Sequence, residues 1–280
     1  MSYICPICSA PLVKQQNAWQ CEQRHQFDCA KEGYVNLLPV QKKKTKDPGD
    51  NKEMMFARRE FLNQGFYQPL SDKVNQLAFE YAPDANKILD IGCGEGYYSH
   101  RLFEALQSVT QSHCELFGVD ISKSAIRYAA KRYSDLHFCV ASAFEMPLAN
   151  NSFDLAIRIY APSKIEELQR VIKPGGILIT VSPGPTHHYA LKKKIYSEPK
   201  LHPQGPLVLD GFTYLAHEAL SYSLSLTHAD DIDHFLNMTP YAWKLSDSQK
   251  SQIIEQGLEC EIDFKIEIHQ REQETIRSLI

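Results

Sequence analysis

The sequence predicts an α/β protein with a mostly parallel sheet, helices on both faces and a small metal-binding domain at its N-terminus. Three observations carry this prediction. A short apolar run at 88–91 breaks into the glycine-rich sequence GCGEG, and a helical pattern follows, as in ligand-binding strand–turn–helix units. Further apolar runs alternate with helical patterns after it, as in sheets built from βα units. The first forty residues differ, because cysteines and a histidine stand among few aliphatic residues.

The N-terminal segment, 1–40, has the spacing of a structural metal site. Four soft ligands follow the pattern C-x2-C-x12-C-x3-H: Cys5, Cys8, Cys21 and His25. This pattern suits a closed, tetrahedral zinc site, and the metal would supply folding free energy that so few aliphatic residues cannot. Cys29 is an alternative to His25 as the fourth ligand. A redox-active C-x-x-C is a rival interpretation, but no strand pattern precedes Cys5 to make a thioredoxin-like unit.

A basic linker, 41–52, follows this domain, and 53–280 is expected to form one α/β domain. The linker holds four lysines in five positions and the turn-forming sequence DPGD, so we expect it to be flexible. Its lysines either contact phosphates or face water. The net charge of −4 is unevenly spread: 1–50 and 51–196 each carry +2, and 197–280 carries −8. The first two-thirds of the chain can therefore present a basic face to a nucleic acid.

Length and composition indicate an ordinary soluble protein. With 280 residues, 43% apolar and 23% charged, the chain has material for one large and one small domain. No apolar run approaches the roughly 20 residues of a membrane span, and the N-terminus lacks the pattern of a signal peptide. Eight cysteines without an export signal favour metal binding or free thiols over disulfides. We therefore expect a cytoplasmic protein without a membrane partner.

The glycine-rich turn after the strand at 87–91 is the expected ligand site. A dinucleotide fingerprint, G-x-G-x-x-G, would require glycine where the chain has Tyr97. Asp90 ends the strand instead, and a carboxylate there repels a pyrophosphate but suits a cationic, amine-bearing ligand. The alternative is an ordinary tight turn, which rarely needs three alternating glycines behind an acid.

A second acid ends the next predicted strand, 117–122, which has the sequence FGVDIS. Asp120 would lie at the carboxyl edge of the sheet, where open α/β sheets bind ligands, and its carboxylate can accept both hydroxyls of a ribose. Ser122 and the small apolar residues after it predict an N-cap and an amphipathic helix. Two strand ends therefore bring two carboxylates toward one ligand.

Together, LDIGCGEG and GVDIS resemble the class I S-adenosylmethionine-dependent methyltransferases. The resemblance implies cofactor contacts for the glycine turn and the two strand ends: Asp90, Gly92, Gly94, Glu95 and Asp120. It also implies a Rossmann-like sheet and a helix that covers the cofactor before the first strand. Helices are expected at 53–61 and from about 70 to 81. Tyr67, at their junction, is the expected lid residue, unless it is simply a core tyrosine.

The remaining segments extend the resemblance to about residues 60–185. Strands are expected at 137–142, 152–157 and 177–181, with a helix at 166–172 and the turn KPGG before the last strand. The loop at 142–148 occupies the place where the family contacts adenine. An appended strand–helix–strand is expected to complete the chain.

The acceptor pocket is expected where the strand at 152–157 ends. Tyr160 and Pro162 would line it, and backbone carbonyls of that turn could accept an N–H. His187, in a loop after the last parallel strand, is the favoured histidine at the mouth of the site. Residues 238–243 either pack in the core or stack on a base, and packing is the preferred interpretation.

The order of these motifs along the chain resembles the bacterial 23S ribosomal RNA guanine-N1 methyltransferases. The motifs are CPIC with C-x3-H, DPGD, EMMFARREF, GFYQPL, LDIGCGEGYY, IRIYAP and MTPYAW. The resemblance implies zinc on the four ligands, cofactor contacts from Tyr67, Gly94, Glu95 and His187, and recognition of a 23S hairpin by a homodimer. Two alternatives stay open: a small-molecule methyltransferase, whose activity would survive deletion of 1–40, and a non-catalytic, zinc-dependent RNA-binding factor.

Overall fold

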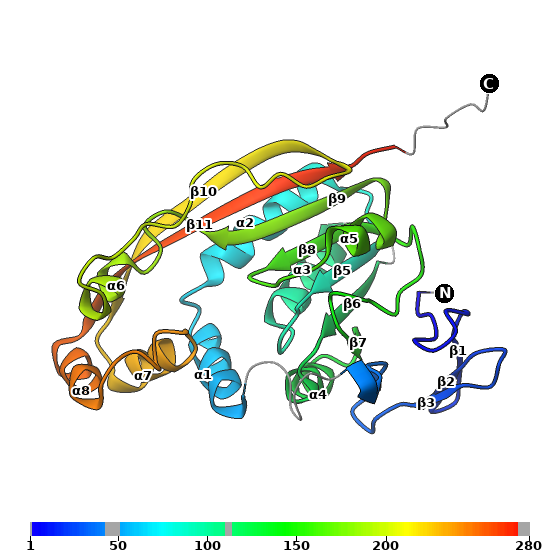
Figure 1. The fold of residues 1–280 in the computed structure, drawn as a ribbon, viewed down its shortest axis with the longest axis horizontal. Helices are drawn as coiled ribbons and strands as arrows, with labels where there is room; N and C mark the ends of the chain where they lie inside the picture. Colours follow the sequence, from blue (N-terminus) through cyan, green and yellow to red (C-terminus); the bar gives the residue numbers. More distant parts are fainter. Residues whose placement is uncertain (1, 43–50, 110–113, 274–280) are drawn as a thin grey trace.

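The computed structural model describes residues 2–42, 51–109 and 114–273, and its main feature is an eight-stranded sheet (Figure 1). The strand order is β10-β11-β9-β8-β5-β6-β7-β4. The strands are β4 (Val35–Asn36), β5 (Lys87–Ile91), β6 (Glu115–Asp120), β7 (His137–Val140), β8 (Phe153–Ile159), β9 (Ile172–Pro183), β10 (Phe212–Leu226) and β11 (Leu258–Arg271). The pairs from β4 to β9 are parallel, and β11 and β10 add antiparallel strands beside β9.

Helices cover both faces of this sheet, as the sequence predicts. They are α1 (Lys52–Asn63), α2 (Gln68–Tyr81), α3 (Tyr97–Val109), α4 (Lys123–Arg132), α5 (Ile165–Val171), α6 (Tyr189–Ile195), α7 (Ala229–Asn237) and α8 (Asp247–Gln256). On one face of the sheet, to which Ile88 and Leu116 point, a buried cluster contains side chains from helices α1, α2, α3, α4 and α7. A second cluster lies on the other face, where Leu89 and Phe117 point, and takes in α5. The mixed sheet with helices is confirmed.

The N-terminal ribbon shares this second cluster. It contains β1 (Val13–Gln15), β2 (Ala18–Gln20) and β3 (Gln26–Asp28), followed by β4 and a short 3-10 helix, Val40–Lys42. The ring of Tyr3 packs edge-on against Trp19 of the ribbon and Phe117 of the sheet, at 5.0 and 5.6 Å between ring centroids. Because β4 pairs with β7, the ribbon also contributes the outermost strand of the main sheet. Most of the expected basic linker, 43–50, lies outside the described residues.

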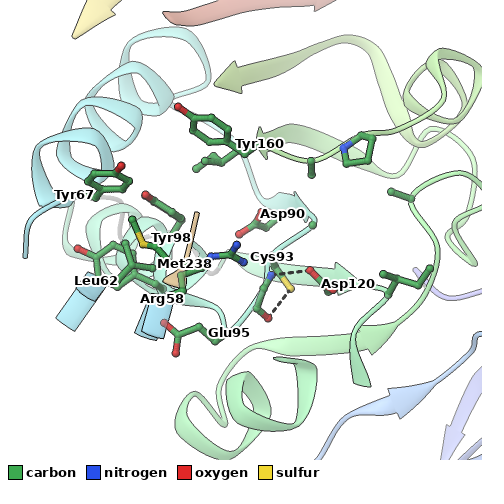
Figure 2. Close-up of a pocket in the computed structure, with 18 of the residues that line it drawn as sticks. Arg58, Leu62, Tyr67, Asp90, Cys93, Glu95, Tyr98, Asp120, Tyr160 and Met238 are labelled. Atoms are coloured by element: carbon green, nitrogen blue, oxygen red, sulfur yellow. Dashed lines mark hydrogen bonds between the residues drawn. The ribbon is translucent and has the colours of Figure 1, made fainter. Parts of the chain in front are cut away.

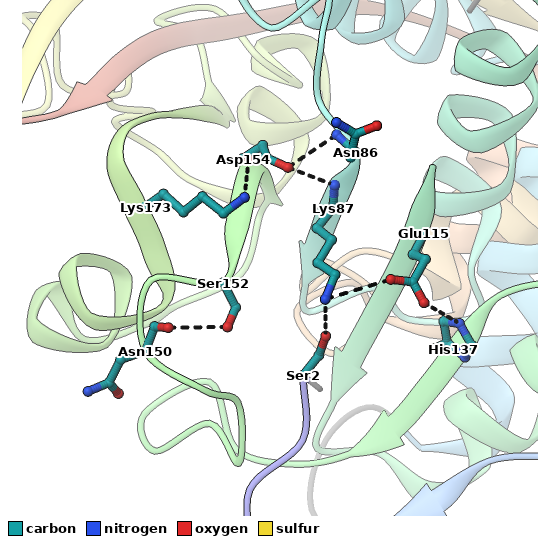
Figure 3. A network of polar contacts seen from close by, with 9 residues as sticks. All are labelled: Ser2, Asn86, Lys87, Glu115, His137, Asn150, Ser152, Asp154 and Lys173. Atoms are coloured by element: carbon teal, nitrogen blue, oxygen red, sulfur yellow. Dashed lines mark hydrogen bonds and ion pairs between the residues drawn. The ribbon is translucent and has the colours of Figure 1, made fainter. Parts of the chain in front are cut away.

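A polar network ties the ribbon to the end of the sheet opposite the glycine turn (Figure 3). Asp154 accepts the backbone N–H groups of Asn86 and Lys87 at 3.1 and 2.9 Å and pairs with Lys173. The Lys87 ammonium donates to Ser2 at 3.2 Å and lies 3.7 Å from Glu115. These contacts hold the N-terminal ends of β5, β6 and β8 together, and they leave the opposite ends of the strands open for a ligand.

The predicted elements recur with shifted boundaries. The strand expected at 117–122 spans Glu115–Asp120, and KPGG, expected as a turn, falls within β9. The appended segment holds two long strands, β10 and β11, with α7 and α8 between them. Among the helices of the described residues, none has the length and apolar character that crossing a membrane requires.

Candidate functional site

A pocket with a volume of about 590 Å³ lies at the carboxyl ends of β5, β6 and β8 (Figure 2). Volumes of this order hold a nucleoside-sized ligand. All seven residues expected to bind the cofactor line it: Tyr67, Asp90, Gly92, Gly94, Glu95, Asp120 and His187. The pocket therefore brings together residues that lie up to 120 positions apart in the sequence.

The glycine turn needs its glycines for two different reasons. Gly92 and Gly94 both have positive φ, at 75° and 55°, which side-chain-bearing residues rarely adopt. A Cβ on Gly92 would stand 2.3 Å from the Cβ of Ala161, so this glycine lets two strand ends approach each other. A Cβ on Gly94 would meet nothing within 4 Å. Because Gly94 lines the pocket, that open space is available to a ligand.

Asp120 is fixed by two backbone donors. Its Oδ2 accepts the N–H of Gly94 at 3.0 Å, and its Oδ1 accepts the N–H of Ser122 at 2.8 Å. Ser122 also caps α4 through a side-chain contact with the N–H of Ala125, as the sequence predicts. These bonds orient the carboxylate at the pocket wall.

Two further acids of the pocket are buried. Asp90 is 2% exposed and accepts the Ser99 hydroxyl at 2.6 Å. Burial, with the nearby charge of Asp120, raises the pKa of Asp90 to about 7 despite this hydrogen bond. Glu95 is 3% exposed; burial raises its pKa to about 7, although Arg132 at 3.9 Å opposes the shift. A cationic ligand would favour the ionised carboxylates and stabilise this pair of acids.

Tyr67, His187 and His188 form another part of the pocket lining. Tyr67 lies at the junction of α1 and α2, and its hydroxyl is 3.0 Å from Nε2 of His188. The ring of His188 stacks on His187 with 3.8 Å between centroids. His188 has a positive φ of 57°, a backbone conformation that is uncommon for histidine. Tyr67 is buried, as a core tyrosine would be, and it also lines the pocket.

His187 is held in one tautomer by a backbone donor. Its Nδ1 accepts the N–H of Asp263 at 3.1 Å, so the proton of the neutral ring is on Nε2. That Nε2–H donates to the Tyr160 hydroxyl at 3.2 Å. Burial, with His202 nearby, lowers the pKa of His187 to about 3, so the ring is neutral at physiological pH. The Tyr160 oxygen therefore accepts from His187, and the hydroxyl hydrogen does not point toward His187.

Several lining residues were not singled out from the sequence. Arg58 on α1, Tyr98 on α3 and His188 all contact the pocket. Their only sequence signal was their place near motifs already identified, in EMMFARREF and LDIGCGEGYY and beside His187. The expected adenine loop does line the pocket through residues 142–144. Residues 238–241 also line it, whereas Trp243 is 68% exposed and lies outside it.

The four expected metal ligands form one cluster in the ribbon. Their ligand atoms all lie within 4.8 Å of one another, and Cys29 is not among them. The Sγ of Cys8 is 3.7 Å from that of Cys21, and Nδ1 of His25 is 3.5 Å from the Sγ of both Cys5 and Cys21. The bond lengths of tetrahedral zinc give edges of about 3.8 Å between two sulfurs and about 3.5 Å between sulfur and nitrogen. The donor set therefore fits zinc.

Comparisons with known proteins agree with both sites. The family model of the RlmA N-terminal zinc ribbon matches residues 3–46, and a methyltransferase-domain model matches residues 83–239. A 23S rRNA (guanine(748)-N(1))-methyltransferase of Streptomyces fradiae is 32% identical over 248 residues, which cover 85% of each chain. The chain belongs to the 23S rRNA (guanine-N1)-methyltransferase family.

A second member of this methyltransferase family shows similar coverage. YxjB of Bacillus subtilis (strain 168), which carries a provisional name of the same kind, is 30% identical over 252 residues. The match covers 85% of this chain and 86% of YxjB. As a member of the family, the protein is an S-adenosylmethionine-dependent methyltransferase with a zinc ribbon.

Proposed function

We propose that this protein methylates N1 of a guanine in 23S ribosomal RNA, with S-adenosylmethionine as the methyl donor. The observation that carries the proposal is the pocket, which brings Asp90, Gly94 and Asp120 together with Tyr160 and His187. We assign the first three to the cofactor and Tyr160 to the acceptor. Tyr160 is 47% exposed, so an acceptor base can reach it from solvent. The named relatives support the choice of RNA and of guanine N1.

The cofactor residues are assigned by their place in the pocket. The Asp120 carboxylate would accept the ribose hydroxyls, and residues 142–144 would contact the adenine. Gly94 and Glu95 would lie against the methionine part, where Asp90 offers a carboxylate to the ammonium group. Tyr67 and His187 would close the pocket over the sulfonium. The carboxylates of the pocket are complementary in sign to the sulfonium and ammonium groups of this cofactor.

The chemistry requires proton loss at the acceptor. Bound S-adenosylmethionine supplies an activated methyl group, and the protein must hold guanine N1 in line with it at roughly 3 Å. His187 is a poor candidate for the base, because its Nδ1 already accepts the Asp263 N–H and its Nε2 carries a proton. The Tyr160 hydroxyl, which accepts from His187, can donate to guanine O6, where negative charge develops as N1 loses its proton. Backbone carbonyls of the 160–162 turn are proposed to accept a hydrogen bond from N1–H and polarise it, and the proton is released to solvent water as the N1–CH3 bond forms and the S–CH3 bond breaks.

The ribbon is the proposed RNA-recognition element. Its zinc site would hold the short strands β1 to β3 rigid beside the sheet, and the 23S substrate would be a hairpin whose target base is unpaired or flipped, because N1 lies on the pairing edge. We also propose that two copies form the RNA-binding cleft as a homodimer and that the reaction takes place in the cytoplasm. The family resemblance supports these last proposals, and a measurement of mass in solution tests the dimer.

The test is transfer of a labelled methyl group from S-adenosylmethionine to protein-free 23S rRNA that lacks the modification, followed by nucleoside mass analysis. A 1-methylguanosine product would establish the reaction and the modified atom. Primer extension would then locate the base and show whether it is the guanine 748 named for the Streptomyces relative. Absence of label in any RNA, with cofactor binding intact, would overturn the proposal in favour of a small-molecule acceptor.

A further inference from the structure

Arg58 enters the cofactor pocket from a helix that precedes the glycine turn in the chain. It lies on α1 one turn before Leu62, and side chains four positions apart share a helix face. Both residues line the pocket. Figure 2 shows the Arg58 guanidinium reaching from α1 into the pocket, on the side where Asp90, Cys93 and Glu95 stand. Helix α1 therefore supplies a charged group to the site as well as covering it.

The charges that line the pocket are unbalanced. Asp90, Glu95 and Asp120 contribute carboxylates, whereas Arg58 alone contributes a permanent positive charge among the lining residues that the structure describes. The histidine pair adds no charge at neutral pH, because burial lowers the pKa of both His187 and His188. For an anionic group of a ligand in this pocket, Arg58 is thus the positively charged side chain among the described lining residues.

The cofactor carries one such anionic group. Its methionine part ends in an α-carboxylate beside an α-ammonium group, and its adenosine part has no charge. Asp120 lies where the ribose is placed, so the amino-acid end extends along the glycine turn toward Asp90. A guanidinium binds a carboxylate through two parallel N–H···O bonds, which fix orientation as well as position.

We propose that Arg58 binds the α-carboxylate of S-adenosylmethionine while Asp90 faces its α-ammonium group, so that α1 is part of the cofactor site. The inference rests on the cofactor placement proposed above and not on the identity of the RNA acceptor. Its consequence is selectivity. The pocket would distinguish the complete amino-acid end of the cofactor from adenosine derivatives that lack the carboxylate.

The experiment compares two ligands by isothermal titration calorimetry without RNA. S-adenosylmethionine and its decarboxylated form differ only in the α-carboxylate. The variant Arg58→Gln is expected to weaken binding of S-adenosylmethionine by about 10- to 100-fold, and to change binding of the decarboxylated form less than twofold. Arg58→Lys keeps the charge but loses the two-pronged geometry. Its affinity for S-adenosylmethionine is therefore expected to lie between those of the parent protein and Arg58→Gln, and its loss of affinity is again expected to be larger for S-adenosylmethionine than for the decarboxylated form.

The matched control is Arg59→Gln, which removes the same charge one position along α1. Arg59 also contributes to the potential around Glu95 but does not line the pocket, so its loss reports the general effect of charge. We expect it to leave both affinities within about twofold. Thermal melts of each variant check folding, and Arg58→Lys carries the test if Arg58→Gln fails to fold.

Two results would overturn the inference. Equal losses for the two ligands would mean that Arg58 supports the shape of the pocket, and unchanged affinity for both would mean that it acts elsewhere, for example on an RNA phosphate. Failure of the parent protein to bind S-adenosylmethionine would instead refute the cofactor placement itself. Cofactor binding without methylation of RNA would refute the proposed acceptor and leave the role of Arg58 standing.

Discussion

Replacing Asp90 with asparagine should stabilise the protein without cofactor and weaken its affinity for the cofactor. The Asp90 side chain is almost completely buried, and its pKa of about 7 exceeds the ordinary value of 3.8 by about three units. At 1.36 kcal/mol per unit, the ionised carboxylate destabilises the folded state by about 4 kcal/mol at high pH. Asparagine keeps an oxygen for the Ser99 hydroxyl and carries no charge, so the Asp90→Asn variant should recover part of this energy.

The stability gained by Asp90→Asn should increase with pH. Because the pKa of Asp90 is higher in the folded state than in the unfolded state, its cost is small below pH 4, grows between about pH 4 and pH 7, and is constant above. The stability advantage of Asp90→Asn should therefore be about 2.5 kcal/mol larger at pH 8 than at pH 5. Glu95, whose pKa is also about 7, keeps a similar dependence in both proteins, so it cancels in the comparison.

Urea denaturation of the zinc-loaded protein without cofactor, followed by circular dichroism at the two pH values, measures this difference. Asp135→Asn is the control, because Asp135 is exposed between α4 and β7 and its change should have the same small effect at both values. An advantage of Asp90→Asn that is equal at pH 5 and pH 8, or a loss of stability at pH 8, would refute the reasoning. Calorimetry should show at least a tenfold loss of S-adenosylmethionine affinity in the same variant.

Four other substitutions test the pocket and the zinc site. Gly94→Asn should largely keep the fold, because asparagine tolerates the positive φ of 55° at this position, and should abolish cofactor binding, because its side chain enters open pocket space. Gly92→Ala should lower stability by about 1–3 kcal/mol, because its Cβ would meet Ala161. Melts and calorimetry that showed the same behaviour for both variants would contradict this. Cys8→Ser should lower bound zinc, measured by elemental mass spectrometry, and reduce the melting temperature, and a full zinc content would exclude Cys8 as a ligand. Tyr160→Phe should lower kcat on 23S rRNA by about 10²-fold through loss of a donor to guanine O6, with the affinity for S-adenosylmethionine unchanged; an unchanged kcat would refute that role.

The sequence was sufficient for features set by short spacings. The glycine turn, Asp90 and Asp120 follow strands whose apolar runs are local, and parallel strands necessarily bring their carboxyl ends to one edge. The zinc ligands are equally local, since two knuckles of the chain fix all four. These features were therefore predictable before any distance was known.

Contacts between distant segments were not predictable in this way. The Tyr67 hydroxyl meets His188 across 121 positions, and the tautomer of His187 depends on a backbone N–H of β11, 76 positions away. Neither contact leaves a periodic signal in the sequence. Arg58 was missed for the same reason, because a charged residue in an amphipathic helix is expected to face water, and only the three-dimensional structure shows that it lines the same pocket as the glycine turn.

The position of the ribbon determines how its proposed role in RNA recognition can be tested. Deletion of 1–40 would remove β4 from the edge of the main sheet and uncover Phe117, against which Tyr3 packs. Loss of activity after such a deletion would report damage to the sheet, whatever the acceptor is. Substitution of exposed ribbon residues such as Lys14 and Arg24 leaves those contacts in place. Because the ribbon and the methyltransferase sheet share one buried cluster, the proposed recognition role can be separated from catalysis by surface substitutions but not by deletion of the ribbon.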